Sequence, residues 1–381
     1  MNDPSAAGGE ALDPPPGGTR RLKLLYQRNE RKVAIASFSG GFILDALTVD
    51  RVDSWRLIGQ QVGYLAVIMV ALTQMFLEEG RPLRELDKMS VLKRWYFNYR
   101  TALVSFLLGT LLNLYTIFYF KSSSLVVSFA FLGFLVFLLV ANESARFRSL
   151  GLSFRFALLS LCMLSFFACM VPVLVGSIGL VVFLFSILVG CVPLIGLSLW
   201  IRARAPERVQ QARRQISIPL GLVLVGFLAF YLFRLIPPVP LSIPFIGVYH
   251  DVEKTEQGYR LSHERPAWRF WENGDQQFLA QGGDKIYVFF RIFSPTRFSD
   301  QVTMRWYWKN DAGRWAPQDS IPINIVGGRK QGFRGYGVKT NYQVGDWKVQ
   351  VETNDGREIG RIYFNVESAP IAQRSFEVDL D

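Results

Sequence analysis

The sequence predicts an α-helical transmembrane bundle of about seven spans, followed by an all-β, immunoglobulin-like sandwich domain. Hydrophobic residues make up 50% of the 381 positions and charged residues only 19%, whereas a soluble protein usually carries about a quarter charged residues. The apolar residues are concentrated in long runs before residue 246, and beyond it they alternate with polar residues. This division excludes a disordered chain and a coiled coil, and it argues against one large soluble enzyme.

The apolar runs before residue 246 set the expected number of spans. Residues 156–201 are 46 consecutive positions without a charged side chain, and one helix of that length would extend about 69 Å. Because the hydrocarbon core of a bilayer is about 30 Å thick, we expect two spans here, divided at Gly176-Ser177. The run 101–141 divides in the same way at Lys121-Ser-Ser-Ser124. Single spans at 33–49, 57–76 and 216–235 complete the count of seven.

The net charge of +11 arises entirely within the apolar part of the chain. Residues 1–245 hold 24 Lys and Arg against 13 Asp and Glu, and residues 246–381 hold 18 of each. With seven spans, 19 of the basic residues lie on one side of the membrane and 3 on the other. The positive-inside rule then places the N-terminus in the cytoplasm and the C-terminal domain outside it. Basic residues between apolar runs indicate membrane orientation rather than binding of nucleic acid.

Four segments follow from these patterns. Residues 1–32 are polar and basic, and we expect a disordered cytoplasmic N-terminus. Residues 33–236 are the predicted polytopic transmembrane domain. The prolines of residues 237–245 predict a stiff linker, and residues 246–381 are the predicted extracytoplasmic β-sandwich domain.

Alternating side chains predict the strands of the C-terminal domain. Apolar residues recur at every second position in 302–308, 347–351 and 362–366, which is the pattern of a half-buried antiparallel strand. Residues 285–293 are apolar on both faces and are expected to form a central strand. The turn residues Asn354-Asp355-Gly356 indicate a hairpin. About seven short strands without helical periodicity are typical of an immunoglobulin-like sandwich.

Short motifs within residues 284–367 combine aromatic residues with glycine turns. With these motifs, the stretch resembles the bacterial domain of unknown function 2914. The resemblance implies a bacterial envelope protein without a known activity. Together with the predicted spans and the distribution of charge, it predicts a multi-pass protein of the bacterial inner (cytoplasmic) membrane. The motifs are Arg305-Trp306-Tyr307, Gly327-Gly328, Gly345-Asp346-Trp347-Lys348-Val349, Asp355-Gly356 and Phe364-Asn365-Val366.

The sequence contains no recognisable catalytic or metal-binding motif. It has no glycine-rich phosphate loop, no Gly-x-Ser-x-Gly elbow and no His-Glu-x-x-His. Its two histidines, in His250-Asp251 and His263-Glu264, would each provide about one metal ligand, because neighbouring residues of a strand point to opposite faces. We therefore predict no catalytic residues, no bound metal, no cofactor and no enzymatic activity.

Polar residues within or beside the apolar runs are candidates for a membrane site, because an ionisable group in hydrocarbon is costly and often functional. Asp45 lies about 6 Å from the outer end of the first run. Together with its neighbours it indicates either an outward-facing cation or proton site or a salt-bridged helix end. The candidates are Asp45, Asp50, Asp53, Gln60 and Asn113.

Aromatic and basic residues in the C-terminal domain are candidates for contact with a ligand or partner. Trp268, Arg269 and Trp271 cluster in an expected loop before the sandwich, and they suit a glycan, a peptide or a protein. They equally suit docking against lipid headgroups or covering a sheet edge. The other contact candidates are Arg305, Tyr307 and Arg334.

The expected function is that of a membrane protein whose β domain binds or scaffolds another envelope component, either a protein or a glycan. Its other predicted partner is membrane lipid. Two alternatives remain open. One is a transporter or channel for a small solute or ion with a regulatory β domain, and the other is a membrane sensor.

Overall fold

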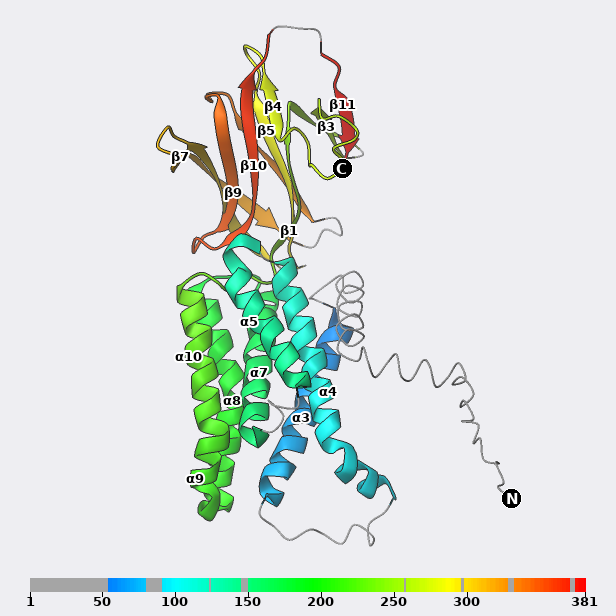
Figure 1. Ribbon diagram of the computed structural model, residues 1–381, viewed down its shortest axis with the longest axis vertical. Coiled ribbons are helices and arrows are strands. Elements are labelled where there is room, and N and C mark those ends of the chain that lie inside the picture. The colour runs from blue at the N-terminus through cyan, green and yellow to red at the C-terminus, as the bar shows by residue number, and fades with distance from the viewer. Residues whose placement is uncertain are drawn as a thin grey trace, which may run out of the picture. The chain divides into compact units, whose positions relative to one another are not determined.

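The computed structural model describes residues 54–79, 91–122, 125–144, 150–256, 258–295, 298–327, 332–370 and 374–381. All of them belong to one compact unit, Arg51–Asp381. Within this unit a set of helices is followed by a domain built of strands (Figure 1). The predicted segments 1–32 and 33–49, with the candidates Asp45, Asp50 and Asp53, lie outside the described residues.

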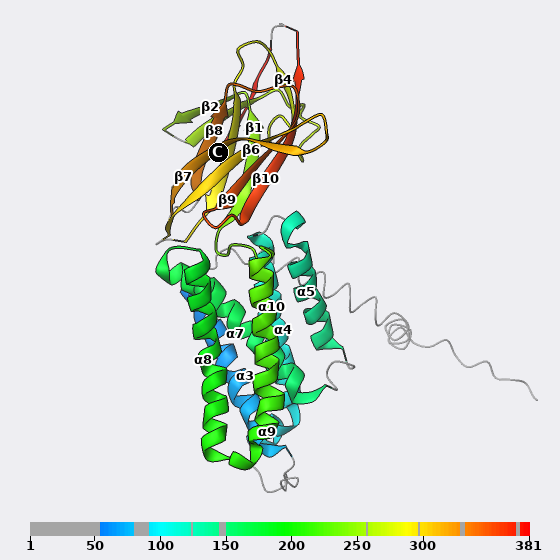
Figure 2. The same ribbon diagram turned by 90° about the vertical axis from the view of Figure 1, so that its left-hand side faces the viewer.

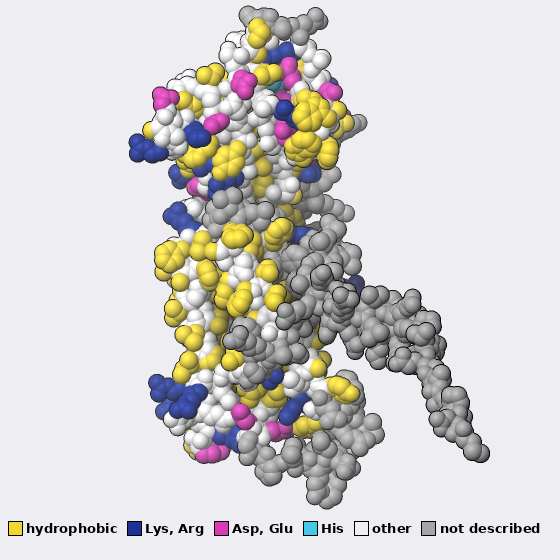
Figure 3. Space-filling model, viewed as in Figure 1, with side chains coloured by type: hydrophobic (Ala, Val, Ile, Leu, Met, Phe, Trp, Pro, Cys, Tyr) yellow, Lys and Arg dark blue, Asp and Glu magenta, His cyan; other side chains and the backbone are white. Residues whose placement is uncertain are grey.

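The helical region consists of long apolar helices joined by short connections. Its lateral surface is covered by hydrophobic side chains (Figure 3). The long helices are α3 (Trp55–Glu78), α4 (Val91–Lys121), α5 (Leu125–Glu143), α7 (Gly151–Val175), α8 (Leu180–Arg204) and α10 (Ile218–Leu232), and the short ones are η2 (Pro206–Arg208), α9 (Val209–Ala212) and η3 (Arg213–Ser217).

Five stretches of the described residues are long and apolar enough to cross a membrane, so the expected seven spans are not supported. Within α5, the described residues contribute a shorter apolar stretch, Ser128–Asn142, which does not count among the five. The seventh expected span, 33–49, is among the residues not described. The five stretches are Trp55–Glu78, Tyr99–Lys121, Gly151–Val175, Leu180–Arg204 and Pro206–Leu232.

The expected divisions of the two long apolar runs are found where the turn residues stand. Gly176 caps α7 in the left-handed conformation (φ 80°), and its backbone N–H donates to the carbonyl of Pro172 at 2.8 Å. Glycine adopts this conformation without steric cost. Helix α8 begins four residues later, and α4 and α5 are separated after Lys121.

The β domain contains eleven strands among the described residues, rather than the expected seven. The additional strands are short, charged edge segments such as Asp251–Thr255 and Glu377–Leu380, whose side chains do not alternate clearly enough to be recognised. The strands are β1 (Ser242–Tyr249), β2 (Asp251–Thr255), β3 (Gly258–His263), β4 (Gln277–Ala280), β5 (Ile286–Phe293), β6 (Ser299–Lys309), β7 (Trp315–Val326), β8 (Phe333–Lys339), β9 (Gly345–Thr353), β10 (Glu358–Ser368) and β11 (Glu377–Leu380).

The strands form three sheets with the orders β4-β10-β9-β6-β7, β1-β5-β8 and β11-β3-β2. Strands β6, β9 and β10 of the five-stranded sheet lie side by side in Figure 2. The inner faces of β6, β9 and β10 carry the predicted alternating apolar residues, including Trp306, Trp347 and Phe364, in the main core. Strand β5 is central, and both of its faces are buried. Phe290 packs in the main core, while Phe289 packs in a second cluster with Tyr249 and Leu261. The apolar character of both faces thus reflects packing on two sides.

Strand β7 forms one edge of the five-stranded sheet. It carries Pro317 and Pro322, which lie opposite Tyr307 and Thr303 of β6. Proline has no backbone N–H, so it is tolerated at an edge but disrupts a central strand. The two prolines therefore fit the position of β7 in the sheet.

The end of α10 contacts the hairpin between β9 and β10. The hydroxyl of Tyr231 donates to Asp355 Oδ2 at 2.8 Å, and the buried guanidinium of Arg357 lies 4.9 Å from the Tyr231 ring. Arg357 Nε in turn donates to Asp355 Oδ2 at 2.8 Å. These contacts link the last long helix directly to the predicted hairpin.

Tyr231→Phe should weaken this link. The substitution removes a hydrogen bond to a carboxylate, which contributes about 1.5 kcal/mol, but keeps the ring stacked on Phe183 at 3.8 Å. We expect amide hydrogen exchange in the turn at Gly356 to become about tenfold faster. Tyr64→Phe is the control, because its hydroxyl only accepts a bond from the exposed Gln60, and it should leave exchange in the turn unchanged. Equal effects of the two substitutions would contradict the link.

Candidate functional site

An exposed aromatic loop, residues 266–274, connects β3 to β4. It lies within the β domain rather than before it, because three strands precede it. Trp268, Phe270 and Trp271 are 61%, 81% and 60% exposed. Their rings touch edge to face, with centroids 5.6 Å apart for Trp268 and Trp271 and 5.2 Å for Phe270 and Trp271. The structure therefore brings the predicted tryptophans together on the surface.

Arg269 lies between these rings and the sheet. Its guanidinium carbon is 4.8 Å from the centroid of Trp268, and Nη1 donates to Gln277 Oε1 at 2.8 Å. The same Nη1 lies 3.8 Å from Glu272 Oε2. The arginine thus fixes the orientation of the exposed tryptophan and holds the loop against β4.

The end of the aromatic loop is joined to β1 by backbone hydrogen bonds. The N–H of Asp275 donates to the carbonyl of Val248 at 2.7 Å, and the N–H of Val248 donates to the carbonyl of Asn273 at 3.3 Å. Gly274 forms a bridge with Val248 and has a φ of +69°. Glycine is needed here, because a Cβ atom would lie 1.9 Å from the Val248 carbonyl oxygen. The loop is therefore held at its base and exposed at its tip.

A cluster of buried and half-buried ionisable groups, the His250 cluster, lies beside the base of the loop. It consists of His250, Glu264, Asp275, Asp284 and Arg374. The His250 side chain is 5% exposed, and its Nε2 lies 3.5 Å from Glu264 Oε2 and 3.6 Å from Asp275 Oδ2. Its ring stacks on Phe278 with centroids 4.0 Å apart. Arg374 Nη1 lies 2.6 Å from Asp284 Oδ2, and Nε lies 3.4 Å from Glu264 Oε1.

Burial shifts the pKa of two members of the His250 cluster in opposite directions. Desolvation, assisted by the positive charge of Arg374, lowers the pKa of His250 to about 4. Desolvation raises the pKa of Asp275 to about 6, although its carboxylate accepts the backbone N–H of Glu264 at 2.9 Å. At neutral pH the imidazole is neutral and the carboxylate is charged.

The His250 cluster does not have the arrangement of a metal centre. Among the described residues, no group of three or more His, Cys, Asp or Glu is placed to hold a metal ion. The other histidine, His263, belongs to a separate pair in which its Nε2 lies 3.3 Å from Asp379 Oδ2.

The remaining contact candidates of the β domain lie in two other places. Arg305 and Tyr307 are on the outer face of β6, where Arg305 Nε lies 3.0 Å from Glu352 Oε2. The Lys348 ammonium lies 4.2 Å from the Tyr307 ring centroid. Arg334 is on β8, in a different sheet, and its Nε lies 3.1 Å from Asp381 Oδ2. The structure therefore does not unite these three residues with the aromatic loop.

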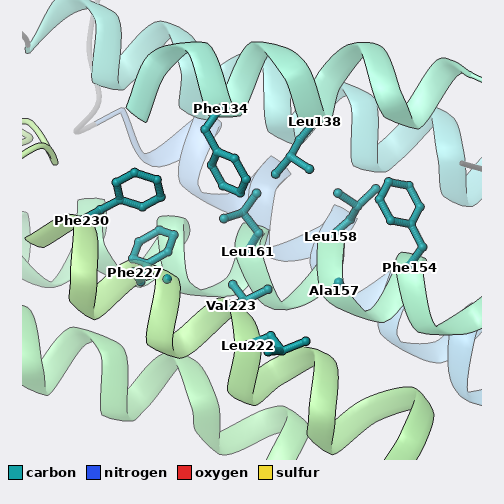
Figure 4. Close-up of a pocket in the computed structure, with 11 residues that line it drawn as sticks. Phe134, Leu138, Phe154, Ala157, Leu158, Leu161, Leu222, Val223, Phe227 and Phe230 are labelled. Atoms are coloured by element: carbon teal, nitrogen blue, oxygen red, sulfur yellow. The ribbon is translucent and has the colours of Figure 1, made fainter. Parts of the chain in front are cut away.

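The described membrane candidates do not share the cavity of the helical region. Gln60 is exposed on α3, and its Nε2 donates to the Tyr64 hydroxyl at 2.9 Å. Asn113 is half-buried on α4. The cavity between α5, α7 and α10 is lined by neither of them (Figure 4).

Residues 299–366 match the family described as "Protein of unknown function (DUF2914)". The match confirms the resemblance found in residues 284–367, and no curated protein matches the chain. An immunoglobulin-like protein from Pseudomonas aeruginosa is 13% identical with a TM-score of 0.21, covering 34% of this chain and 98% of that one. The Pseudomonas fluorescens alkylpurine DNA glycosylase AlkC, bound to DNA containing an abasic site analog, is 12% identical with a TM-score of 0.22, covering 80% of this chain and 98% of that one.

The DUF2914 match covers β6 to β10 and stops short of the aromatic loop and the His250 cluster. The cluster was also missed by sequence reasoning, because its members are scattered from His250 to Arg374. The only local signal is that each histidine is followed by an acidic residue, in His250-Asp251 and His263-Glu264. The loop, in contrast, was visible in the sequence because three of its aromatic residues lie within four positions, 268–271.

Proposed function

We propose that the chain is a multi-pass protein of the bacterial inner membrane whose extracytoplasmic, immunoglobulin-like β domain binds another envelope component through the aromatic loop. In this proposal the β domain acts by binding rather than by catalysis. The bound component is a protein or a glycan.

Membrane insertion is supported by the five apolar stretches and by the distribution of charge. Basic side chains of the described residues concentrate at the end where α4 and α7 begin and α8 ends, while the opposite end holds Arg56, Lys121 and Arg234. Lys and Arg gather near α9 in Figure 3. By the positive-inside rule the first end faces the cytosol. Its basic residues are Arg100, Arg155, Arg202, Arg204, Arg208, Arg213 and Arg214.

The observation that carries the binding proposal is the exposure of three adjacent aromatic side chains on a loop that is anchored at its base. Tryptophan and arginine are enriched among the residues that dominate binding energy. A rigid loop loses little conformational entropy when a partner binds. Isolated exposed apolar residues are ordinary, but a contiguous cluster marks an interaction site.

Photocrosslinking in intact cells tests the proposal. A benzophenone amino acid replaces Phe270 in the full chain, and the matched control replaces Val344, which is 59% exposed on the β8–β9 connection. We expect an envelope protein or glycan adduct at position 270 that is absent at position 344. The adduct should be lost when Trp268 and Trp271 are both changed to Ser. Adducts with lipid alone, or equal adducts at both positions, would reject the aromatic loop as the contact.

A further inference from the structure

The cavity between α5, α7 and α10 has a volume of about 240 Å³, and every side chain that lines it is apolar. Phe134 and Leu138 of α5 face Leu158 and Leu161 of α7 and Phe227 of α10 across it (Figure 4). Protein interiors are close-packed, whereas this space is partly open to the surface of the helices. It therefore has room for an apolar group from outside the chain.

The cavity opens onto the apolar side of the helices. At one end the ring of Phe131 closes the gap between α5 and α10, with centroids 6.1 Å from Phe227 and 5.3 Å from Phe230. Two of the lining residues, Phe134 and Leu222, are themselves exposed, by 37% and 70%. Exposed Phe137 and Val225 stand beside them on α5 and α10. The opening is therefore continuous with the surface that would face lipid.

The lining and the volume restrict what can occupy the cavity. Water requires two to four polar partners, and the lining residues provide no polar side chain. A helix about 10 Å wide is too thick for the space. The volume corresponds to roughly eight groups the size of a water molecule or a methylene, which suits a single flexible hydrocarbon chain.

We propose that this cavity binds one acyl chain of a membrane phospholipid between α5 and α10. The proposal rests on the membrane location given under the proposed function, and it adds a specific lipid site that the aromatic loop does not involve. The lining contacts only the hydrocarbon, so binding depends on chain length and not on the headgroup. The bound chain fills the gap that α5 leaves beside α10.

Gly226 offers a substitution that fills the cavity. A Cβ atom at Gly226, which lines the cavity, meets no atom within 4 Å. Gly226→Phe should therefore occupy the space without disrupting α10. Gly221→Phe is the matched control, because Gly221 lies on the same helix, has the same free space for a Cβ and does not line the cavity.

Native mass spectrometry of the full chain in detergent tests the proposal, with dioleoyl phosphatidylglycerol, dioleoyl phosphatidylethanolamine and dihexanoyl phosphatidylcholine as probes. We expect one retained dioleoyl lipid of either headgroup on the wild type and on Gly221→Phe. The lipid-bound fraction of Gly226→Phe should be at least tenfold smaller, and the dihexanoyl lipid should not be retained. Added dioleoyl lipid should raise the Tm of the wild type and the control but not that of Gly226→Phe.

Several outcomes would overturn the acyl-chain site. These are a wild type that retains no lipid, equal retention by Gly226→Phe, equal retention of the short-chain probe, or a dimer that only Gly226→Phe abolishes. A monodisperse Gly226→Phe whose Tm in lipid-free detergent equals or exceeds that of the wild type shows that the variant is folded. Carbonate extraction of cell membranes tests the membrane location separately, so failure of the cavity and failure of the membrane proposal are distinguishable.

Discussion

Gly274→Ala should destabilise the β domain by about 4 kcal/mol or more, which is a large effect for a single substitution. The added methyl group would lie 1.9 Å from the carbonyl oxygen of Val248 and 2.9 Å from its carbonyl carbon. Both atoms belong to the backbone of β1, so no side-chain rotation relieves the clash. The positive φ adds its own penalty. We expect the bridge between β1 and the base of the aromatic loop to be lost.

Gly283→Ala is the matched control for this substitution. Gly283 also has a positive φ, of +96°, but a Cβ atom there meets nothing within 4 Å. Gly283→Ala should lower the stability of the β domain only by the backbone strain of the positive φ, about 1–2 kcal/mol. Denaturant unfolding of the full chain in detergent, followed by near-ultraviolet circular dichroism, compares the two. Similar losses for both variants would refute the close approach of β1 and the loop.

Substitutions in the His250 cluster should give opposite dependences of stability on pH. The native pKa of His250, about 4, lies below the ordinary value of 6.5. The neutral imidazole therefore contributes to the stability of the folded state above pH 6.5, and this contribution is lost as the pH falls towards 4. The native pKa of Asp275, about 6, lies above 3.8. The protonated Asp275 carboxyl therefore contributes to the stability of the folded state below pH 3.8, and this contribution is lost as the pH rises through 6. Each amounts to about 3 kcal/mol, so in the wild type the two largely cancel between pH 4 and 6.5.

A variant that lacks one of these two ionisable groups should show the effect of the other group on the pH dependence of stability. The stability of Asp275→Asn should fall by about 3 kcal/mol when the pH is lowered from 7 to 4, whereas that of His250→Gln should rise by a similar amount. The double variant should resemble the wild type in its pH profile. Urea unfolding of the full chain in detergent at intervals of half a pH unit measures all four proteins. Parallel profiles would show that the two groups do not titrate as their burial implies.

The long elements of the fold were predictable because their side-chain patterns are regular. The charge-free run 156–201 exceeds the thickness of a bilayer, and its division at Gly176 follows from the glycine that caps α7. The alternation in β6, β9 and β10 reflects a buried inner face and a solvated outer face. The short strands β2 and β11 lack this regularity, because most of their side chains are exposed and both strands lie at the edges beside β3.

The candidate site was only partly predictable. Trp268, Arg269 and Trp271 lie close enough together in the sequence to be recognised as a surface cluster. The structure places them together. Arg334 looked equally suitable as a contact residue, yet it pairs with Asp381, which follows β11 and is far from Arg334 in the sequence. The His250 cluster depends on long-range pairing of β1, the aromatic loop and the segment at Arg374, and no local spacing encodes that arrangement.

The two prolines of β7 limit the pairing of this sheet edge with a strand of another molecule. An unpaired sheet margin with a full set of N–H groups can recruit a strand from a neighbouring molecule and start aggregation. Pro317 and Pro322 remove two of those donors from the margin formed by β7. The β domain is thereby hindered from adding a strand of a neighbouring copy along this margin.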